Sequence, residues 1–239
     1  MAILKFDKVT VQYPIYNSRS MSLRNQLVRI STGGRIESEA GHIQVVTALN
    51  EVSFGLKDGD SVGLIGHNGA GKSTLLRTMA GVYHPISGSV VRQGRVATVL
   101  ELGAGMDPEL SGYENIIRMG ILMGLSMAEI LSKTKEIEDF TQLGDFLQLP
   151  VRTYSSGMAT RLMFAVATST APDILLVDEV FGTGDAEFQV KAKERMEALI
   201  KSVGIFVFAS HNHELVRQYC NRVFRLEHGC LLEVDINAI

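Results

Sequence analysis

A glycine-rich segment with the sequence GHNGAGKST occupies residues 66–74. It matches the pattern GxxxxGK[ST] in full, and in such loops backbone N–H groups surround a phosphate group. The glycines let these amides converge on an anion at the start of a helix, where the helix dipole adds to the attraction. Lys72 is predicted to bridge the β- and γ-phosphates of a nucleoside triphosphate, and Ser73 to ligate Mg²⁺. The other predicted members of this site are Gly66, His67, Asn68, Gly69, Ala70, Gly71 and Thr74.

Two adjacent carboxylates end the apolar run ILLVDE at residues 174–179. An acid at the carboxyl end of a central parallel strand faces the crevice in which nucleotides bind. Asp178 is therefore expected to hold Mg²⁺, directly or through water, and Glu179 to polarise the attacking water. An apolar strand that ends in two acids is common by itself, but beside a phosphate loop it indicates hydrolysis.

The segment YSSGM at residues 154–158 precedes an apolar pattern with helical spacing. Ser155 and Gly157 would offer a hydroxyl group and backbone donors to a second anion at the start of that helix. The alternative is a plain N-cap, in which Ser155 only satisfies the helix end.

Alternating apolar and polar residues predict an antiparallel ribbon of two strands at 4–13 and 47–56, and a buried strand at 60–65 precedes a helix at 72–80. The phosphate loop therefore lies between a strand and a helix. The fold class is α/β with a mixed sheet, an N-terminal antiparallel β subdomain and a helical insertion at about 112–171, all in one domain over 1–239. The remaining strands are expected at 89–92, 95–100, 173–177, 205–209, 222–227 and 231–234, and the remaining helices over 113–146 in two pieces joined near 125–126, after residue 158, at 186–202 and at 213–219.

Bulk composition limits the classes of function. The chain is 46% hydrophobic and 21% charged, as in folded globular proteins, and its net charge of -3 argues against a nucleic-acid partner. No apolar run approaches the roughly 20 residues of a membrane span, and the N-terminus does not resemble a signal peptide, so another chain must cross any membrane at which this protein works. Cys220 and Cys230 lack metal-ligand or disulfide spacing and are read as reduced thiols.

A basic amphipathic insertion is expected at about residues 15–46. Leu23, Leu27 and Ile30 recur at helical spacing, and four arginines at positions 19, 24, 29 and 35 are not interrupted by any acid. Such a segment suits the anionic surface of a cytoplasmic leaflet or a membrane partner. A helix packed on its own domain with a solvated basic face is the alternative.

The order and spacing of these motifs resemble the ATP-binding cassette (ABC) transporter ATPases, a branch of the P-loop NTPases, over nearly the whole chain. The resemblance implies ATP and Mg²⁺ as cofactors and a head-to-tail homodimer, in which Ser155 and Gly157 of one subunit close over the γ-phosphate held by the other. It also implies that Asp185 in GTGD couples the two sites. His211 in FASH matches the switch histidine that contacts the γ-phosphate and orders the attacking water, and Tyr13 matches the aromatic residue that stacks on adenine, with Tyr16 as a rival.

Departures from the common pattern point to one branch of that family. The signature is YSSGM in place of LSGGQ, and the usual loop glutamine is replaced at Glu101 or Leu102, so the glutamine's role is not carried over. With LELGAGMDPELSGYEN and DEVFGTGDAEF, these features resemble the ATPases that export O-antigen, capsular or teichoic-acid polysaccharides. The resemblance implies two ATPase copies with two copies of an integral-membrane permease, moving lipid-linked polysaccharide from the cytoplasmic face of the inner membrane. Because the chain stops at Ile239, no appended carbohydrate-binding domain is expected.

Three other functions are weighed against this one. A cassette for a drug, a lipid or another small substrate would share the motor but not the cargo. A soluble cassette ATPase acting on nucleic acid or ribosomes typically has two cassettes or a long coiled coil, and this sequence has neither. Phosphate-loop kinases and GTPases lack the serine-glycine signature and the terminal histidine.

Overall fold

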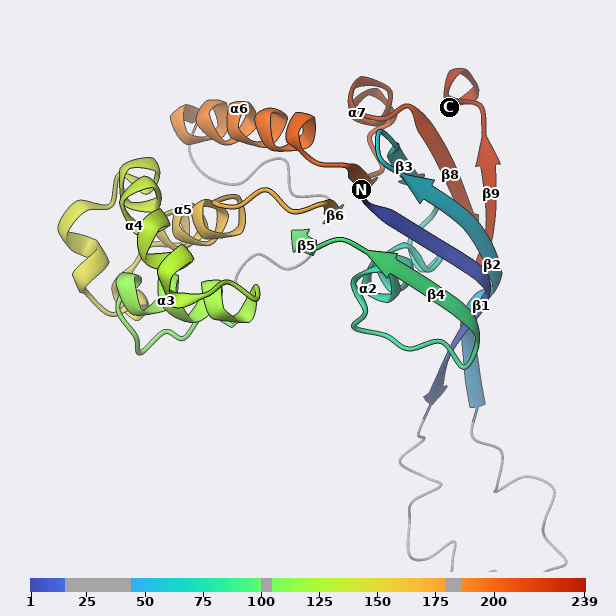
Figure 1. Cartoon of the computed structure of the whole chain (residues 1–239), viewed down its shortest axis with the longest axis horizontal. Helices are drawn as coiled ribbons and strands as arrows, with labels where there is room; N and C mark the ends of the chain where they lie inside the picture. Colours follow the sequence, from blue (N-terminus) through green and yellow to red (C-terminus); the bar gives the residue numbers. More distant parts are fainter. Residues whose placement is uncertain (16–43, 100–104, 179–185) are drawn as a thin grey trace, which may run out of the picture.

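The computed structural model describes residues 1–15, 44–99, 105–178 and 186–239, which form two sheets and a group of helices (Figure 1). The smaller sheet is antiparallel in the order β2-β1-β4, and the larger has the order β5-β6-β7-β3-β8-β9 with an antiparallel edge strand β9. The strands are β1 (Ile3–Ile15), β2 (Gln44–Lys57), β3 (Ser61–Ile65), β4 (Ser87–Gln93), β5 (Val96–Val99), β6 (Ile174–Asp178), β7 (Ile205–Ala209), β8 (Arg222–Glu227) and β9 (Cys230–Val234).

The larger sheet has a buried face on each side, because successive strand residues point to opposite faces. Ile174 and Leu176 of β6 pack toward the smaller sheet and helix α2 (Lys72–Ala80). Leu175 and Val177 pack toward helices α6 (Ala186–Ser202) and α7 (His213–Tyr219). Since both faces are covered, the central strands are continuous apolar runs rather than alternating ones.

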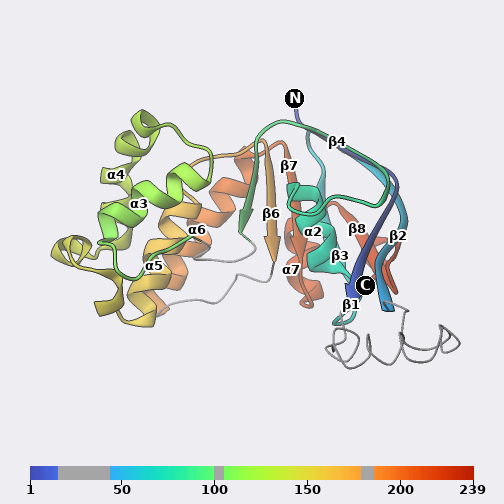
Figure 2. The ribbon, with the colours of Figure 1, turned by 90° about the horizontal axis from the view of Figure 1, so that it is seen from below.

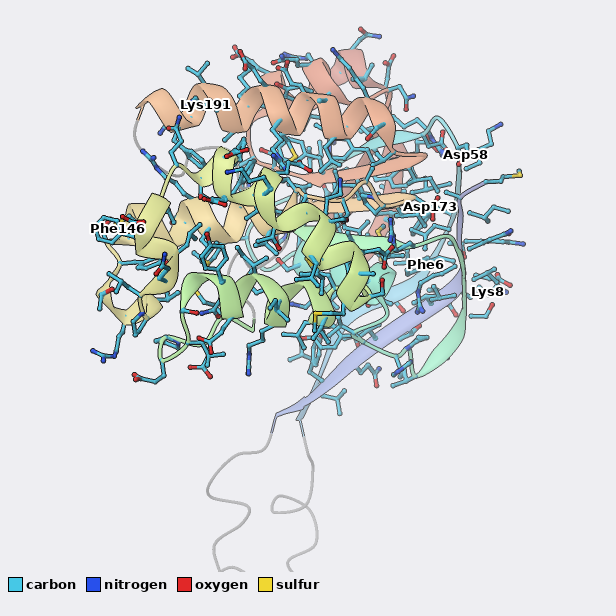
Figure 3. The ribbon with its side chains drawn as sticks, turned by 60° about the vertical axis from the view of Figure 1, so that its left-hand side comes forward. Phe6, Lys8, Asp58, Phe146, Asp173 and Lys191 are labelled. Atoms are coloured by element: carbon cyan, nitrogen blue, oxygen red, sulfur yellow. The ribbon has the colours of Figure 1, made fainter. Side chains whose placement is uncertain are left out.

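A separate helical group lies beside the sheets, with a hydrophobic core of its own (Figure 2). It contains α3 (Gly112–Leu122), α4 (Met127–Thr141), α5 (Ser156–Ala167) and two short 3-10 helices, η1 (Gly144–Gln148) and η2 (Val151–Thr153). Ser111 and Ser126 start α3 and α4 with complete capping boxes, which explains why the long apolar stretch breaks into two helices. In Figure 3, Phe146 lies at this helical end, whereas Lys8 and Asp58 lie at the opposite end of the molecule.

Three aromatic rings join the helical group to the sheet. The Phe164 ring of α5 lies 6.0 Å from that of Phe140 in α4 and 5.9 Å from that of Phe188 in α6. Arg195 of α6 stacks on Phe140, at 4.4 Å from the ring centroid, and donates to the Thr168 carbonyl after α5. The junction between the two parts is therefore packed and hydrogen-bonded.

Most of the predicted elements are confirmed. The ribbon is antiparallel, with Phe6 paired to Phe54. The strands at 61–65, 205–209 and 222–227 and the helices at 72–80, 186–202 and 213–219 begin and end within a residue or two of the expected positions. The second helix of the helical group was predicted to reach residue 146, and this was wrong. It ends at Thr141, because Gln142 takes a left-handed conformation (φ 56°) and the chain continues as η1. The amphipathic helix expected from the spacing of Leu23, Leu27 and Ile30 lies outside the described residues, as does Leu100 of the strand predicted at 95–100.

The two cysteines are both free thiols in different surroundings. Cys220, the C-cap of α7, is buried, and burial raises the pKa of its thiol to about 12, whereas Cys230 is exposed in β9. Because the thiolate is the reactive form, we expect a disulfide reagent to modify Cys230 quickly and Cys220 only on unfolding. Thiol titration should show one rapid equivalent that disappears in Cys230→Ser. Two rapid equivalents in the folded wild-type protein would contradict this prediction.

Candidate nucleotide-binding site

The phosphate loop follows β3 and leads directly into α2. Gly66 and Gly71 have φ angles of 153° and 108°, which residues other than glycine rarely adopt. A Cβ atom at Gly66 would clash with the Leu226 carbonyl oxygen, and one at Gly71 with the Ala48 carbonyl oxygen. Gly71 starts α2 and no side chain caps it, so the first amides of the helix face outward as donors for an anion.

Lys72 is the first residue of α2, and its side chain returns over the loop. Its ammonium donates to the carbonyls of Gly66 (2.6 Å) and His67 (3.2 Å), and the residue is only 9% exposed. The same nitrogen lies 3.3 Å from Nε2 of His211, which follows β7. A charged ammonium can only donate, so this contact is a hydrogen bond in the tautomer of His211 that has a free lone pair on Nε2. The loop carbonyls thus orient a positive charge beside the helix amides.

Ser73 and Asp178 come together from α2 and the end of β6. The Ser73 hydroxyl donates to Oδ2 of Asp178 over 2.9 Å. Hydroxyl and carboxylate oxygens are the ligands that Mg²⁺ prefers, and Mg²⁺ usually takes only one or two of them from the protein. This pair fits that donor set. Within the described ranges no group of three or more His, Cys, Asp or Glu side chains is arranged to hold a metal by itself.

A cavity of about 740 Å³ surrounds these groups. The predicted residues that line it are Tyr13, Asn68, Gly69, Ala70, Gly71, Lys72, Ser73, Thr74, Asp178 and His211. Gly66 and His67 are not in its wall and instead supply the carbonyls that hold Lys72. The volume is in the range of pockets that enclose a small-molecule cofactor.

Tyr13 lies in the wall of this cavity on the smaller sheet. Its hydroxyl donates to Oγ1 of Thr74 over 3.3 Å. Burial raises the pKa of Tyr13, so the phenol is neutral at physiological pH and presents an uncharged ring to the cavity. An aromatic side chain at this place can stack on a nucleotide base.

Five lining residues were missed in the sequence: Val46, Thr47, Ala48, His228 and Gly229. The first three lie in the first half of β2, and the other two form the turn between β8 and β9. Gly229 donates to the Ala70 carbonyl (3.3 Å) and accepts from the Asn50 amide (2.9 Å), which fixes this turn against the phosphate loop. No motif marks these positions, because the packing of the two sheets against each other brings them to the cavity.

The signature residues lie elsewhere. Ser155 is the N-cap of α5, where its hydroxyl accepts from the Met158 amide over 3.2 Å, and neither Ser155 nor Gly157 lines the cavity. Figures 1 and 2 both show α5 on the helical side of the molecule, away from α2. The N-cap is therefore present, the anion-binding role of Ser155 and Gly157 stays a prediction, and any anion site at α5 is separate from the phosphate loop of the same chain. Glu179 and Asp185, and the alternative positions Tyr16, Glu101 and Leu102, lie outside the described residues.

A phosphate loop between a parallel strand and a helix, with an acidic strand end and a histidine beside it, defines a P-loop nucleotide-binding protein. The chain belongs to the ABC transporter family, whose family model matches residues 49–182, and it is an ABC-type ATPase. It is 64% identical to the O-antigen export system ATP-binding protein RfbE of Yersinia enterocolitica over the full length of both chains. It is 38% identical to the O-antigen export system ATP-binding protein RfbB of Klebsiella pneumoniae, over 97% of this chain and 93% of that one.

Solved structures share the fold. The dimeric post-hydrolysis structure of the ATP-binding cassette MJ0796, bound to ADP and Pi, superposes with a TM-score of 0.69 at 19% identity over 98% of both chains. The predicted α/β fold, with its mixed sheet, antiparallel sheet and helical group, is confirmed by this likeness and by the strand order. No helix in the described ranges is long and apolar enough to cross a bilayer.

Proposed function

We propose that this chain is the motor subunit of an exporter that moves lipid-linked polysaccharide of the O-antigen type across the inner membrane. The observation that carries the cargo class is the 64% identity to RfbE of Yersinia enterocolitica, which extends over the whole of both chains rather than over the motifs alone. A likeness restricted to the phosphate loop would have supported any cassette and any cargo.

In the proposed reaction, the chain's own groups bind and orient the triphosphate. The α2 amides and Lys72 hold the phosphates, and Ser73 with Asp178 would hold Mg²⁺. Bound Mg²⁺ would neutralise charge on the phosphate oxygens. Glu179 is proposed to polarise the attacking water, and His211 to order that water from its position beside Lys72.

The proposed working unit is a homodimer. Ser155 and Gly157 lie on the helical side, outside the cavity, so a second copy would have to bring its own α5 over the phosphates. The dimeric state of the ATP-binding cassette MJ0796, which shares this fold, supports that arrangement. Asp185 is proposed to couple the two sites, and ATP would favour the closed dimer until hydrolysis releases it.

The proposed membrane partner is two copies of a permease, with this chain at the cytoplasmic face of the membrane. Helix α3 exposes Ile121 (52%) and Leu122 (63%) beside a groove that also includes Leu110 and Ile117. We place the permease contact on this helical group and on the preceding segment, residues 102–109. The basic segment within 15–46 is proposed to lie near the lipid headgroups.

Complementation tests the cargo. The chain should be produced in a strain that lacks an RfbE-type ATPase but retains its permease. We expect surface O-antigen to return, and to remain absent with Lys72→Ala produced at the same level. Restored resistance to drugs without surface polysaccharide would favour the alternative cargo class. Co-sedimentation with ribosomes or DNA, instead of with permease-containing membranes, would favour the soluble class.

A further inference from the structure

Two residues from opposite ends of α2 hold Tyr13. Near the start of the helix, Thr74 accepts the Tyr13 hydroxyl hydrogen bond over 3.3 Å. Just beyond its end, Tyr83 packs against the Tyr13 ring in a T-shaped contact, with ring centroids 5.5 Å apart and an interplanar angle of 74°. Tyr13 lines the cavity and Tyr83 does not, so Tyr83 can reach a bound nucleotide only through a neighbouring residue such as Tyr13.

The position of Tyr83 is itself fixed by the end of α2. Gly81 ends the helix in a left-handed conformation (φ 84°), and the amides of Val82 and Tyr83 both donate to the Arg77 carbonyl, over 2.9 and 3.3 Å. The Arg77 guanidinium lies 5.9 Å from the Tyr83 ring centroid and donates to the Tyr83 hydroxyl over 3.4 Å. The backbone cap and the guanidinium together set the ring's orientation.

This arrangement links the two halves of a nucleotide site through one helix. The first turn of α2 offers the phosphate-binding groups, and its last turn supports an aromatic ring at the cavity wall. A T-shaped aromatic pair is favourable beyond the area that it buries. A ring already held in place loses less conformational freedom when a base stacks on it, and this raises affinity.

We propose that Tyr83 is a positioning residue for the base of the bound nucleotide, acting through Tyr13 and held in turn by Arg77. The inference rests on the proposed stacking of Tyr13 on adenine. Tyr83 supports the base and not the phosphates, so its effect is confined to ligands that carry a base. It does not touch the reacting atoms.

The test measures the binding of two ligands to the purified full-length protein by calorimetry. One ligand is MgATP and the other is magnesium tripolyphosphate, which has the phosphates but no base. Tyr83→Leu, which keeps apolar volume without a ring, and Tyr83→Ala are expected to weaken MgATP binding roughly threefold to tenfold. Tripolyphosphate binding should be unchanged, and Tyr83→Phe should retain most of the MgATP affinity.

His84→Ala is the matched control, because His84 is the exposed neighbour in the same turn. It should bind both ligands as the wild type does. A double-mutant cycle with Tyr13→Ala shows whether Tyr83 acts through Tyr13 or whether its removal disturbs the binding site in general. In the Tyr13→Ala background, removing the Tyr83 ring is expected to have no further effect on MgATP affinity.

Four results would overturn the inference. Equal weakening of ATP and tripolyphosphate would mean that Tyr83 supports α2 as a whole, and additive losses in the double mutant would mean that Tyr83 does not act through Tyr13. If Tyr13→Ala weakens ATP binding but neither Tyr83 variant does, this inference alone fails. If Tyr13→Ala has no effect, the proposed adenine contact fails first.

Discussion

Lys72→Ala is expected to reduce ATP turnover by at least about 100-fold, the usual loss when one preorganised donor to a reacting group is removed. Lys72 is only 9% exposed, and its ammonium is held by two loop carbonyls at 2.6 and 3.2 Å, so the charge is oriented before the phosphates arrive. MgATP affinity should also fall by roughly 10-fold to 100-fold, in line with about 1.5–3 kcal/mol for a hydrogen bond to a charged group. Phosphate release and calorimetry on the same preparation measure the two effects.

Two matched variants separate charge from structure. Lys72→Arg keeps the charge but its planar guanidinium has a different shape, so it should recover some binding and little turnover. His67→Ala removes a loop side chain outside the cavity wall, while the carbonyl that Lys72 uses remains. It should retain far more activity than Lys72→Ala. Full turnover by Lys72→Ala, with an unchanged melting temperature, would contradict the proposed phosphate site.

Glu179→Gln is expected to lower turnover by roughly 100-fold to 10,000-fold while leaving MgATP binding close to that of the wild type, the loss expected for a general base. The amide keeps the shape of the side chain but cannot accept a proton from water. Because hydrolysis would no longer reopen the dimer, a closed dimer should accumulate in MgATP. Single-turnover kinetics and light scattering measure both consequences.

The neighbouring carboxylate is the comparison. Asp178 accepts the Ser73 hydroxyl bond, so Asp178→Asn alters the proposed Mg²⁺ donor set itself. It should lose the magnesium dependence of ATP binding as well as turnover, whereas Glu179→Gln should lose turnover alone. If both variants lose binding equally, the assignment of separate roles to the two acids is wrong. An active Glu179→Gln protein would require a different group to activate the water.

The amino-acid sequence alone determined most of the elements and the centre of the site. The phosphate loop is one contiguous segment. Its glycines, Lys72 and Ser73 lie close together along the chain, so local spacing was sufficient to find them. Asp178 was also predictable, because a buried parallel strand is a short apolar run that exposes its last residue at the sheet edge. Ser111 and Ser126 carry capping boxes whose partners are only three residues away.

Only the tertiary structure decided what lies around that centre. Val46 and Ala48 lie on the smaller sheet, and the His228–Gly229 turn lies on the larger one. They reach the cavity because the two sheets pack against each other, and no local sequence pattern marks them. The contact between Tyr13 and Tyr83 joins residues 70 positions apart, and the place of Ser155 outside the cavity depends on where the helical group packs. Contacts between distant segments are set by the packing of complete elements, and a sequence read in windows of a few residues does not contain that information.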